Sequence, residues 1–424
     1  MPPSDMTPND TPSNDMPSND MPSNDLAAEA ATHFDDLRAI RRDIHRRPEL
    51  GLQLPETLAR VLAGIDGLEL ETHLSPTISS AVIRIRGRLP GPTVVLRADL
   101  DALALQEDTG EDFASEIPNR MHACGHDLHA AIGVGAIRLL HAHRAELAGD
   151  VLFLFQPGEE GDNGADLMLD EGVLDLAETE LVGAYAVHVT TSEPLGMFTT
   201  RAGALMAGSA TLDVTITGAG GHGSAPQLAR DPHQALAEMI TSLQTMVTRR
   251  FSAFDPVIIS IGWVRGGQVG THNVIPDTAS FGATIRTFSL DHLEKVERFS
   301  AEVIRGVAEA HGVTADIRFE SVTNPLINAP EHAALAERVA RGFGPGRFVE
   351  MAPIGGAEDF AAVLVEVPGA FVFIGACPPE LDPKTAPYNH SNLARFDDAV
   401  LPDAAAYLAA LAMTRLAEVA AERD

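Results

Sequence analysis

The chain has 424 residues, of which 45% are hydrophobic and 21% charged, and its formal net charge is −30 at pH 7. A single hydrophobic core rarely grows beyond about 250–300 residues, so this length predicts two domains. The acidic balance argues against nucleic acid and against an anionic membrane surface as partners, because both are bound through Lys and Arg.

Cysteine content and the N-terminal composition indicate the compartment. Cys124 and Cys377 are the only cysteines, and they do not suggest a disulfide framework. The N-terminus lacks the basic segment and apolar core of a secretory signal, and no apolar run approaches the ~20 residues that a membrane span requires. We therefore predict a cytoplasmic protein in which Cys377 is a buried packing residue.

Residues 1–26 differ in composition from the rest of the chain. The pentapeptide MPSND occurs twice in a row after TPSND. Pro, Ser, Asn and Asp without apolar periodicity cannot bury a core, so this segment predicts a disordered tail. An interaction tag is the alternative interpretation.

The next part of the chain alternates strand-like and helical patterns. Residues 37–50 predict an amphipathic helix that Pro48 ends, and residues 130–142 have helical spacing. Strand-like apolar runs lie at residues 80–85, 93–96, 151–155 and 181–189. This alternation predicts an α/β layer with a mostly parallel central sheet.

From Gly208 the pattern becomes that of a smaller α+β unit. Helical patterns at 232–249 and 291–311 alternate with strand-like runs at 211–216, 257–263, 278–287 and 314–320. Two helices with four strands predict a ferredoxin-like sandwich. After Asn324 the α/β character returns, with a strand at 371–374 and a closing helix at 402–421. We therefore predict a catalytic domain of residues 27–207 and 323–424, with residues 208–322 inserted into it.

The densest cluster of reactive side chains is Met121–His129, with three histidines and Cys124. Cys124 and His126 flank Gly125, where a turn can direct both donors toward one region. A thiolate with an imidazole favours borderline metals such as zinc over magnesium or calcium. The alternative is a buried Cys124 among surface histidines.

Two acidic motifs follow predicted strands. Asp99 and Asp101, in Arg97–Asp101, stand where ligand sites of open α/β sheets gather, although such carboxylates often only cap a helix. Glu159 and Glu160, in QPGEEG, suit a site in which one carboxylate binds a cation and the other accepts a proton. A solvated turn is the alternative for this Glu-Glu pair.

Two single histidines complete the candidate site. His188 ends the strand AYAVHV and His390 lies in YNHSN, and each alone is more commonly structural. Together with Cys124, His126 and Glu160 they supply five donors from four loops or strand ends. Two ions with one shared ligand need about that number.

These motifs carry a family resemblance. The chain resembles the aminoacylase and carboxypeptidase-like metallopeptidases, in the subfamily with hippurate hydrolase, N-acetyldiaminopimelate deacetylase and plant auxin-conjugate hydrolases. The resemblance extends from about Asp35 to Leu411. It rests on the ordered motifs HRRPELG, LRADLDAL, MHACGHDLH, FQPGEEG, GAGGHGSAP, NVIPD, TIRTF, GAEDFA and NHSN.

The resemblance implies roles for residues of the larger domain. It implies two divalent ions, zinc or manganese with nickel as an alternative, bridged by Cys124. Their other ligands would be His126, Glu160, His188 and His390. Glu159 would be the general base for the attacking water, and Asp101 would orient a ligand. Asp99 stands where related peptidases have a metal-binding histidine.

The inserted domain would act as a lid and a dimerisation domain. The resemblance implies that His222 reaches an active site, commonly that of the partner subunit, and stabilises the oxyanion. Asn273 and Arg286 would contact the substrate carboxylate, which suits the planar fork of arginine. A surface ion pair is the alternative for Arg286. Ala104 and Gln227 depart from the common Pro and His of the family.

The expected activity is cleavage of the amide bond in a small N-acyl amino acid. A dipeptidase or metallocarboxypeptidase acting on short peptides is the alternative, because the same site chemistry serves both. A non-catalytic binding protein is a further alternative, against which the intact Glu159 and the five ligands argue. The resemblance also implies a homodimer, assembled through the inserted domain.

Overall fold

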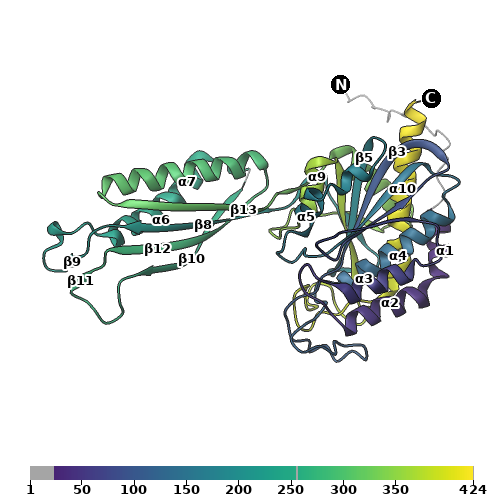
Figure 1. The fold of residues 1–424 in the computed structure, drawn as a ribbon, viewed down its shortest axis with the longest axis horizontal. Coiled ribbons are helices and arrows are strands. Elements are labelled where there is room, and N and C mark those ends of the chain that lie inside the picture. The colour runs from purple at the N-terminus through teal and green to yellow at the C-terminus, as the bar shows by residue number, and fades with distance from the viewer. Residues whose placement is uncertain (1–22, 255, 424) are drawn as a thin grey trace, which may run out of the picture.

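The computed structural model describes residues 23–254 and 256–423. Figure 1 shows a larger body, in which the described N-terminal helices and the C-terminal helix lie together, and a smaller body that extends away from it. Short strands β7 (Gly203–Met206) and β14 (Leu326–Asn328) form an antiparallel pair where the chain passes between the bodies.

The larger body is built on an eight-stranded sheet. Its strands are β1 (Glu71–Leu74), β2 (Ala81–Ile85), β3 (Leu89–Asp99), β4 (Ala148–Gln156), β5 (Leu181–Pro194), β6 (Phe198–Thr200), β15 (Phe348–Glu350) and β16 (Gly369–Cys377). They lie in the order β1-β2-β4-β3-β5-β16-β6-β15. The central pairs β4-β3, β3-β5 and β5-β16 are parallel, which confirms the predicted mostly parallel sheet.

Helices cover both faces of this sheet. One face packs against α1 (Ser23–Ala31), α2 (Phe34–Arg46), α3 (Pro55–Gly64), α4 (His126–Ala142), α8 (Pro330–Arg341) and α10 (Leu401–Arg423), and the other against α5 (Gly164–Asp170) and α9 (Phe360–Glu366). Successive side chains of β3 alternate accordingly, since Val94 and Leu96 join the first core and Val95 joins the second. A strand buried on both faces reads as a continuous apolar run, as β16 does.

The smaller body has a separate hydrophobic core. In chain order it contains β8 (Gly208–Thr217), α6 (Pro232–Arg250), β10 (Val257–Gly266), β12 (Thr278–Thr287), α7 (Leu290–Ala310) and β13 (Thr314–Thr323). The four strands form an antiparallel sheet in the order β10-β12-β8-β13, the ferredoxin-like arrangement. Along most of β8 buried and exposed residues alternate, because α6 and α7 cover only one face of the sheet.

Shorter elements complete the described chain. They are the strands β9 (Gly221–His222) and β11 (Val274–Ile275), and the 3-10 helices η1 (Val173–Leu176), η2 (Pro226–Leu228) and η3 (Asp398–Val400). β9 and β11 pair with each other. Figure 1 places them at the end of the smaller body that is farthest from the larger one.

Several local predictions need correction. The predicted tail of residues 1–26 ends too late, because α1 begins at Ser23 and buries Leu26; residues 1–22 lie outside the described residues. The helix predicted to Leu50 ends at Arg46, because a proline disfavours helical geometry in the residue before it. Contrary to the expectation that no apolar run approaches the length of a membrane span, residues 398–423 form a segment long and apolar enough to cross a membrane, although it lies mostly buried inside the larger body.

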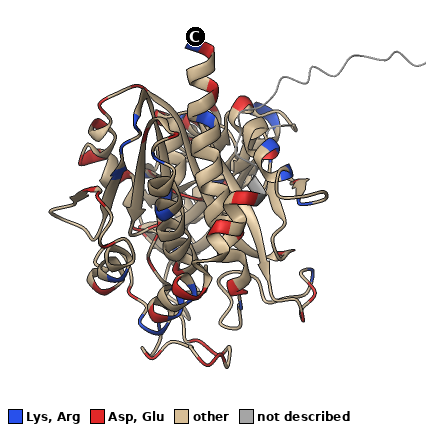
Figure 2. Cartoon of the chain, turned by 90° about the vertical axis from the view of Figure 1, so that its right-hand side faces the viewer, with Lys and Arg blue, Asp and Glu red and all other residues tan. Residues whose placement is uncertain are grey.

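Acidic residues outnumber basic ones on this molecule, with 60 Asp and Glu against 30 Lys and Arg. On the side of the larger body drawn in Figure 2, both signs are interspersed over helices and loops. Arg86, for example, pairs with Glu71 and Glu178 at the surface. The charge excess therefore concerns solubility and long-range attraction of ions more than the fold.

Candidate metal centre

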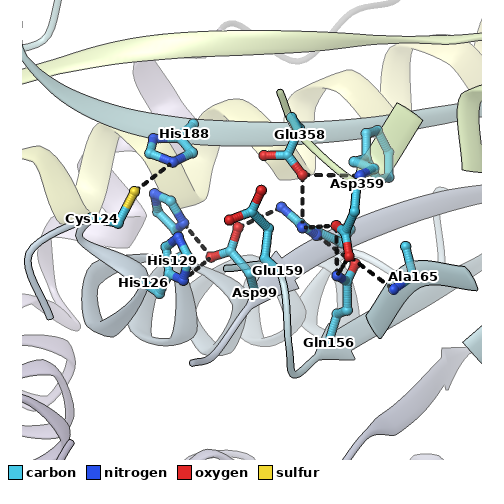
Figure 3. Close-up of polar contacts among 12 residues, drawn as sticks. Asp99, Cys124, His126, His129, Gln156, Glu159, Ala165, His188, Glu358 and Asp359 are labelled. Atoms are coloured by element: carbon cyan, nitrogen blue, oxygen red, sulfur yellow. Dashed lines mark hydrogen bonds and ion pairs between the residues drawn. The ribbon is translucent and has the colours of Figure 1, made fainter. Parts of the chain in front are cut away.

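The candidate ligands gather at the carboxyl edge of the parallel strands. Asp99 ends β3 and Gln156 ends β4, side by side in register. His188 of β5 lies opposite Phe373 of β16. Because parallel strands end at the same edge, the loops that follow them meet there. Figure 3 shows the resulting cluster of imidazoles, carboxyls and one thiol.

Cys124 lies among the other four candidate ligands. Its Sγ atom is 3.3 Å from His188 Nε2 and 3.2 Å from His390 Nε2. Glu160 Oε1 is 3.3 Å from His390 Nε2 and 3.8 Å from His126 Nε2. The structure thus brings together all five side chains that we proposed as ligands from the sequence.

The opposite ring nitrogens of two histidines are fixed by backbone carbonyls. His126 Nδ1 donates to Asp101 O at 2.8 Å, and His188 Nδ1 donates to Val189 O at 2.7 Å. A carbonyl can only accept, so Nδ1 carries a proton in both rings and Nε2 is the ring atom that is left to bind a cation. Burial, together with the nearby His129, lowers the pKa of His188 and keeps this imidazole in the neutral form that binds metals.

The residues fit divalent cations. Among the described residues, His126 Nε2 and Glu160 Oε1 are buried without a hydrogen-bond partner, although buried polar atoms are normally paired. Burial also raises the pKa of the Cys124 thiol, so a nearby cation is needed to hold it as a thiolate. A thiolate, imidazoles and a carboxylate around one region form a donor set for zinc or a similar metal.

Backbone conformation directs Cys124 and His390 toward each other. Gly125, between Cys124 and His126, has φ +92°, and a Cβ atom there would lie 2.4 Å from Val189 Cγ2. His390 itself has φ +70°, an uncommon conformation for a non-glycine residue that is often found at functional sites. The Asn389 side chain supports it by donating to Cys124 O and Val189 O at 3.2 and 3.0 Å.

Asp101 organises the loop that carries the two glutamates. Its carboxylate accepts hydrogen bonds from the backbone N–H of Glu159 at 3.0 Å and of Glu160 at 3.1 Å. Its carbonyl oxygen accepts from His126, so one residue positions a candidate ligand and the candidate base together. Burial and the neighbouring Glu358 and Asp359 raise the pKa of Glu159, which favours proton exchange nearer neutral pH.

A buried ionic network lies behind this centre. Arg97 donates to Asp99, Glu358 and Asp359, and these side chains are at most 4% exposed. Asp99 also accepts from His129 Nδ1 at 2.5 Å, while His129 Nε2 accepts from the N–H of Val189 at 2.9 Å. Since both of its ring nitrogens are occupied, His129 supports the centre rather than binding a metal.

Several members of this network have no role predicted from the sequence. Arg97, Glu358 and Asp359 stand in the motifs LRADLDAL and GAEDFA, but their partners could not be read from the motifs. An available signal was the Glu-Asp pair directly before the apolar helix α9, because charges rarely occur next to a buried helix without partners.

A pocket of about 610 Å³ opens onto the candidate ligands, a size typical of small-molecule sites. Its polar end is formed by the cluster around Cys124 and by Glu159. Met206, Ile354 and Phe373 supply apolar lining, and the smaller body contributes Ser209 at the start of β8 and Thr323 at the end of β13. The pocket therefore offers an apolar wall beside a polar, cation-binding end.

The structure does not bring His222 and Asn273 to this pocket within one chain. Both lie at the far end of the smaller body, where Gly223 N donates to Asn273 O at 2.8 Å. Both side chains are exposed.

Arg286 lies closer to the pocket. It pairs across the sheet with Ser209, which lines the pocket. Its guanidinium donates to Thr284 Oγ1 at 2.8 Å and to Ile285 O at 2.9 Å. The charged fork of Arg286 is therefore held by neutral acceptors, and its backbone pairs with a residue that lines the pocket.

Comparison with known proteins gives consistent matches. Residues 95–414 match the model of peptidase family M20/M25/M40. The chain is 34% identical over 402 residues to IAA-amino acid hydrolase ILR1-like 2 of Arabidopsis thaliana, covering 93% of this chain and 88% of that protein. It is 36% identical over 343 residues to N-acetylcysteine deacetylase of Bacillus subtilis, covering 79% and 87%. The crystal structure of Bacillus subtilis protein YXEP, a dinuclear metal-binding peptidase of the M20 family, aligns with a TM-score of 0.77 and 30% identity over 90% of this chain and 98% of that one.

Proposed function

The chain belongs to peptidase family M20/M25/M40 and is a hydrolase of amide bonds, and within that family we propose that it cleaves N-acyl amino acids. The observation that carries this proposal is the convergence of five metal-binding side chains around Cys124, with the Glu159 carboxyl beside them. A centre of this kind, opening onto a pocket of small-molecule size, suits hydrolysis of a compact substrate.

The pocket and the relatives support the proposed substrate class. The names of the two similar proteins describe an amino-acid conjugate and an N-acetylated amino acid as their substrates. In this chain, Met206, Ile354 and Phe373 provide an apolar wall for an acyl group. We assign the substrate carboxylate to Arg286, because a guanidinium binds carboxylates through two parallel hydrogen bonds.

The five donors would hold two divalent ions, zinc or manganese with nickel as an alternative, with Cys124 shared between them. Ions bound there acidify water and polarise the amide carbonyl. Glu159 takes the proton of the attacking water and afterwards delivers it to the departing amine. Asp101 keeps Glu159 in place, because the backbone N–H of Glu159 donates to the Asp101 carboxylate.

We further propose that the active enzyme is a homodimer. His222 and Asn273 lie far from the pocket of their own chain, so they would serve the pocket of the partner, where His222 would stabilise the oxyanion. The edge strand β10 exposes Ile258, Trp263 and Val264. An exposed apolar edge strand pairs readily with another chain, so β10 is the proposed contact.

A cytoplasmic location is part of the proposal. Cys124 and Cys377 are both free thiols. A catalytic thiolate ligand such as Cys124 is preserved in a reducing compartment, where oxidation does not compete with metal binding.

The test is turnover of a panel of N-acetyl- and N-benzoyl-amino acids and dipeptides, after chelation and after return of Zn²⁺, Mn²⁺ or Ni²⁺. We expect activity toward acylated amino acids to vanish with chelator and to return with one of the metals. Preference for dipeptides would replace the proposal with the peptidase alternative. Metal-loaded protein that hydrolyses no amide would favour a binding protein, and failure to bind metal would refute the assignment of the centre.

A further inference from the structure

Two adjacent glycines, Gly355 and Gly356, form part of the wall of the pocket. They follow Ile354 of the apolar wall and lead to Glu358, which Figure 3 shows near the Glu159 side chain. Because glycine has no side chain, the wall at this point consists of backbone. This stretch of backbone joins the apolar part of the pocket to the carboxyl groups around the proposed base.

Backbone hydrogen bonds fix the position of these glycines. Ile354 N donates to Leu205 O at 2.9 Å, and Ala207 N donates to Gly356 O at 2.9 Å. Leu205 belongs to β7, and Ala207 follows this strand. Gly355 is therefore held on both sides by one neighbouring segment, so a side chain at position 355 would have a fixed direction.

Gly355 differs from the other two glycines of the pocket, because neither backbone conformation nor packing requires a glycine there. Gly161 has φ +115°, a conformation that other residues rarely adopt. At Gly356 an added Cβ atom would lie 3.2 Å from Met206 Cε. Gly355 has no positive φ of this kind, and beyond its chain neighbours a Cβ atom there would meet no atom within 4 Å. The missing side chain of Gly355 thus provides open space in the pocket.

The size of the pocket indicates what this space can hold. Its volume is about 610 Å³, within the roughly 300–1,000 Å³ that is typical of sites for drug-sized ligands. An acetyl group adds only a methyl group to the amide carbonyl and fills little of this volume. A ring or a branched chain on the carbonyl can bury apolar surface against Ile354 and Met206, and such burial favours binding.

We propose that Gly355 is a specificity-determining residue whose missing side chain leaves room for a bulky apolar acyl group. This inference rests on the proposed function and names its substrate class more closely, as amino acids that carry an aromatic or branched acyl group in place of acetyl. The acyl group packs against Ile354 and Met206, and its far edge occupies the space beside Gly355. A side chain at position 355 would fill that space and leave room for acetyl alone.

Substitutions that fill the space test the proposal in the metal-loaded enzyme. The substrates are N-benzoylalanine and N-acetylalanine, which differ only in the acyl group, and we expect wild type to prefer the benzoyl compound. In Gly355→Leu, kcat/KM for N-benzoylalanine should fall about 10–100-fold, the range in which small changes of an apolar pocket discriminate between substrates. The value for N-acetylalanine should fall far less, so that the ratio of the two values drops at least about tenfold. Gly355→Ala should lie between wild type and Gly355→Leu.

Gly306→Leu is the matched control. Gly306 lies in α7, outside the pocket, and a Cβ atom there also meets no atom within 4 Å. Leucine should therefore be accommodated at both positions, and metal content and melting temperature should match wild type in both variants. The ratio of the two kcat/KM values should change only in Gly355→Leu.

The proposal can fail in three ways. An unchanged ratio in Gly355→Leu would show that a side chain at this position points away from the acyl group. An equal loss of kcat/KM with both substrates, or a loss of metal from that variant, would show that position 355 affects the catalytic centre and not the choice of acyl group. A wild-type preference for N-acetylalanine would refute the bulky acyl class.

Binding of the same two compounds, measured by calorimetry in the Glu159→Gln background, tests Gly355 without turnover. Glu159→Gln should bind N-benzoylalanine more tightly than N-acetylalanine, and addition of Gly355→Leu should remove that difference. Such a result, with no amide hydrolysed by wild type, would refute the proposed function and leave the assignment of Gly355 standing. Hydrolysis of both compounds with the same acyl preference in wild type and Gly355→Leu would refute the role of Gly355 and leave the proposed function standing.

Discussion

Cys124 Sγ lies 3.2 Å from His390 Nε2, although 266 positions separate the two residues in the chain. The backbone joins the two segments as well, because His390 N donates to Ala123 O at 2.9 Å. The segment of Cys124 and the segment of His390 thus each supply one ligand, and a backbone hydrogen bond joins the two segments. Removing either ligand should therefore affect metal binding more than the fold.

Substitution of Cys124 by alanine tests its role as the shared ligand. We expect Cys124→Ala to lose at least one ion per chain and more than about 100-fold in kcat/KM, since even residues that only support metal ligands contribute 10–100-fold. Metal per chain after dialysis, measured by elemental analysis, checks this. Cys377→Ala is the matched control, because Cys377 is equally buried but lies outside the cluster. A Cys124→Ala protein that keeps both ions and its activity would contradict the assignment.

Glu159→Gln separates proton transfer from metal binding. The Glu159 carboxyl lies near His126, Glu160 and Glu358, and its backbone N–H donates to Asp101. We expect kcat to fall about 10²–10⁴-fold, the usual contribution of a general base, with unchanged metal content. Glu366→Gln, an exposed glutamate at the end of α9, should behave as wild type. Unchanged turnover in Glu159→Gln would remove Glu159 from the mechanism.

The sequence predicted the parts of the site that depend on local order. A strand followed by a loop places Asp99 and the Glu159 loop at the same sheet edge, because parallel strands share one carboxyl end. The turn at Gly125 could also be anticipated, since glycine is the residue that adopts positive φ without strain. For these residues, the expectation of a mostly parallel sheet was enough.

Other parts depend on contacts that no local pattern encodes. Arg97 and Glu358 meet across 261 positions, and a Glu-Asp pair in a sequence gives no indication of such a partner. Likewise, the distance of His222 from the pocket follows from the length of the smaller body, not from the motif GAGGHGSAP. Helix α1 begins within the predicted tail because Leu26 is buried in the large core. The polar residues around Leu26 in the sequence give no indication of this burial.

Mixing two inactive variants tests whether His222 serves the partner subunit. Glu159→Gln and His222→Ala should each be inactive as homodimers. In a mixed dimer, the intact His222 of one chain can serve the intact Glu159 of the other, which restores one of two sites. With random exchange in equal amounts we expect about a quarter of wild-type activity, because half of the dimers are mixed.

The control for this experiment is a mixture of each variant with itself under the same exchange conditions. It should remain inactive. The oligomeric state is measured in parallel by light scattering, since exchange requires a dimer. No recovery in a sample shown to contain mixed dimers would place His222 in its own chain's site or outside catalysis. A monomer with full activity would contradict the proposed assembly.

A buried histidine away from the metal centre should affect stability at acid pH. His332 of α8 is 3% exposed, and its Nδ1 lies 2.7 Å from the Tyr185 hydroxyl. Burial, with a contribution from Arg415, lowers the pKa of His332 from 6.5 to about 4. Between those values the unfolded chain binds more protons than the folded one. The stabilisation from a neutral His332 is therefore complete above pH 6.5 and is lost as the pH falls toward 4.

We expect the free energy of unfolding to fall more steeply between pH 7 and pH 5 in wild type than in His332→Gln, by about 2 kcal/mol. Urea unfolding of both proteins in the presence of chelator measures this, because chelation removes the pH dependence of metal binding from both. His73→Gln, at an exposed position of β1, should keep the wild-type slope. If wild type and His332→Gln lose stability equally as the pH falls, protonation of His332 does not contribute to acid unfolding. The pH dependence would then come from other buried groups. One such group is His122, because burial lowers its pKa to about 3.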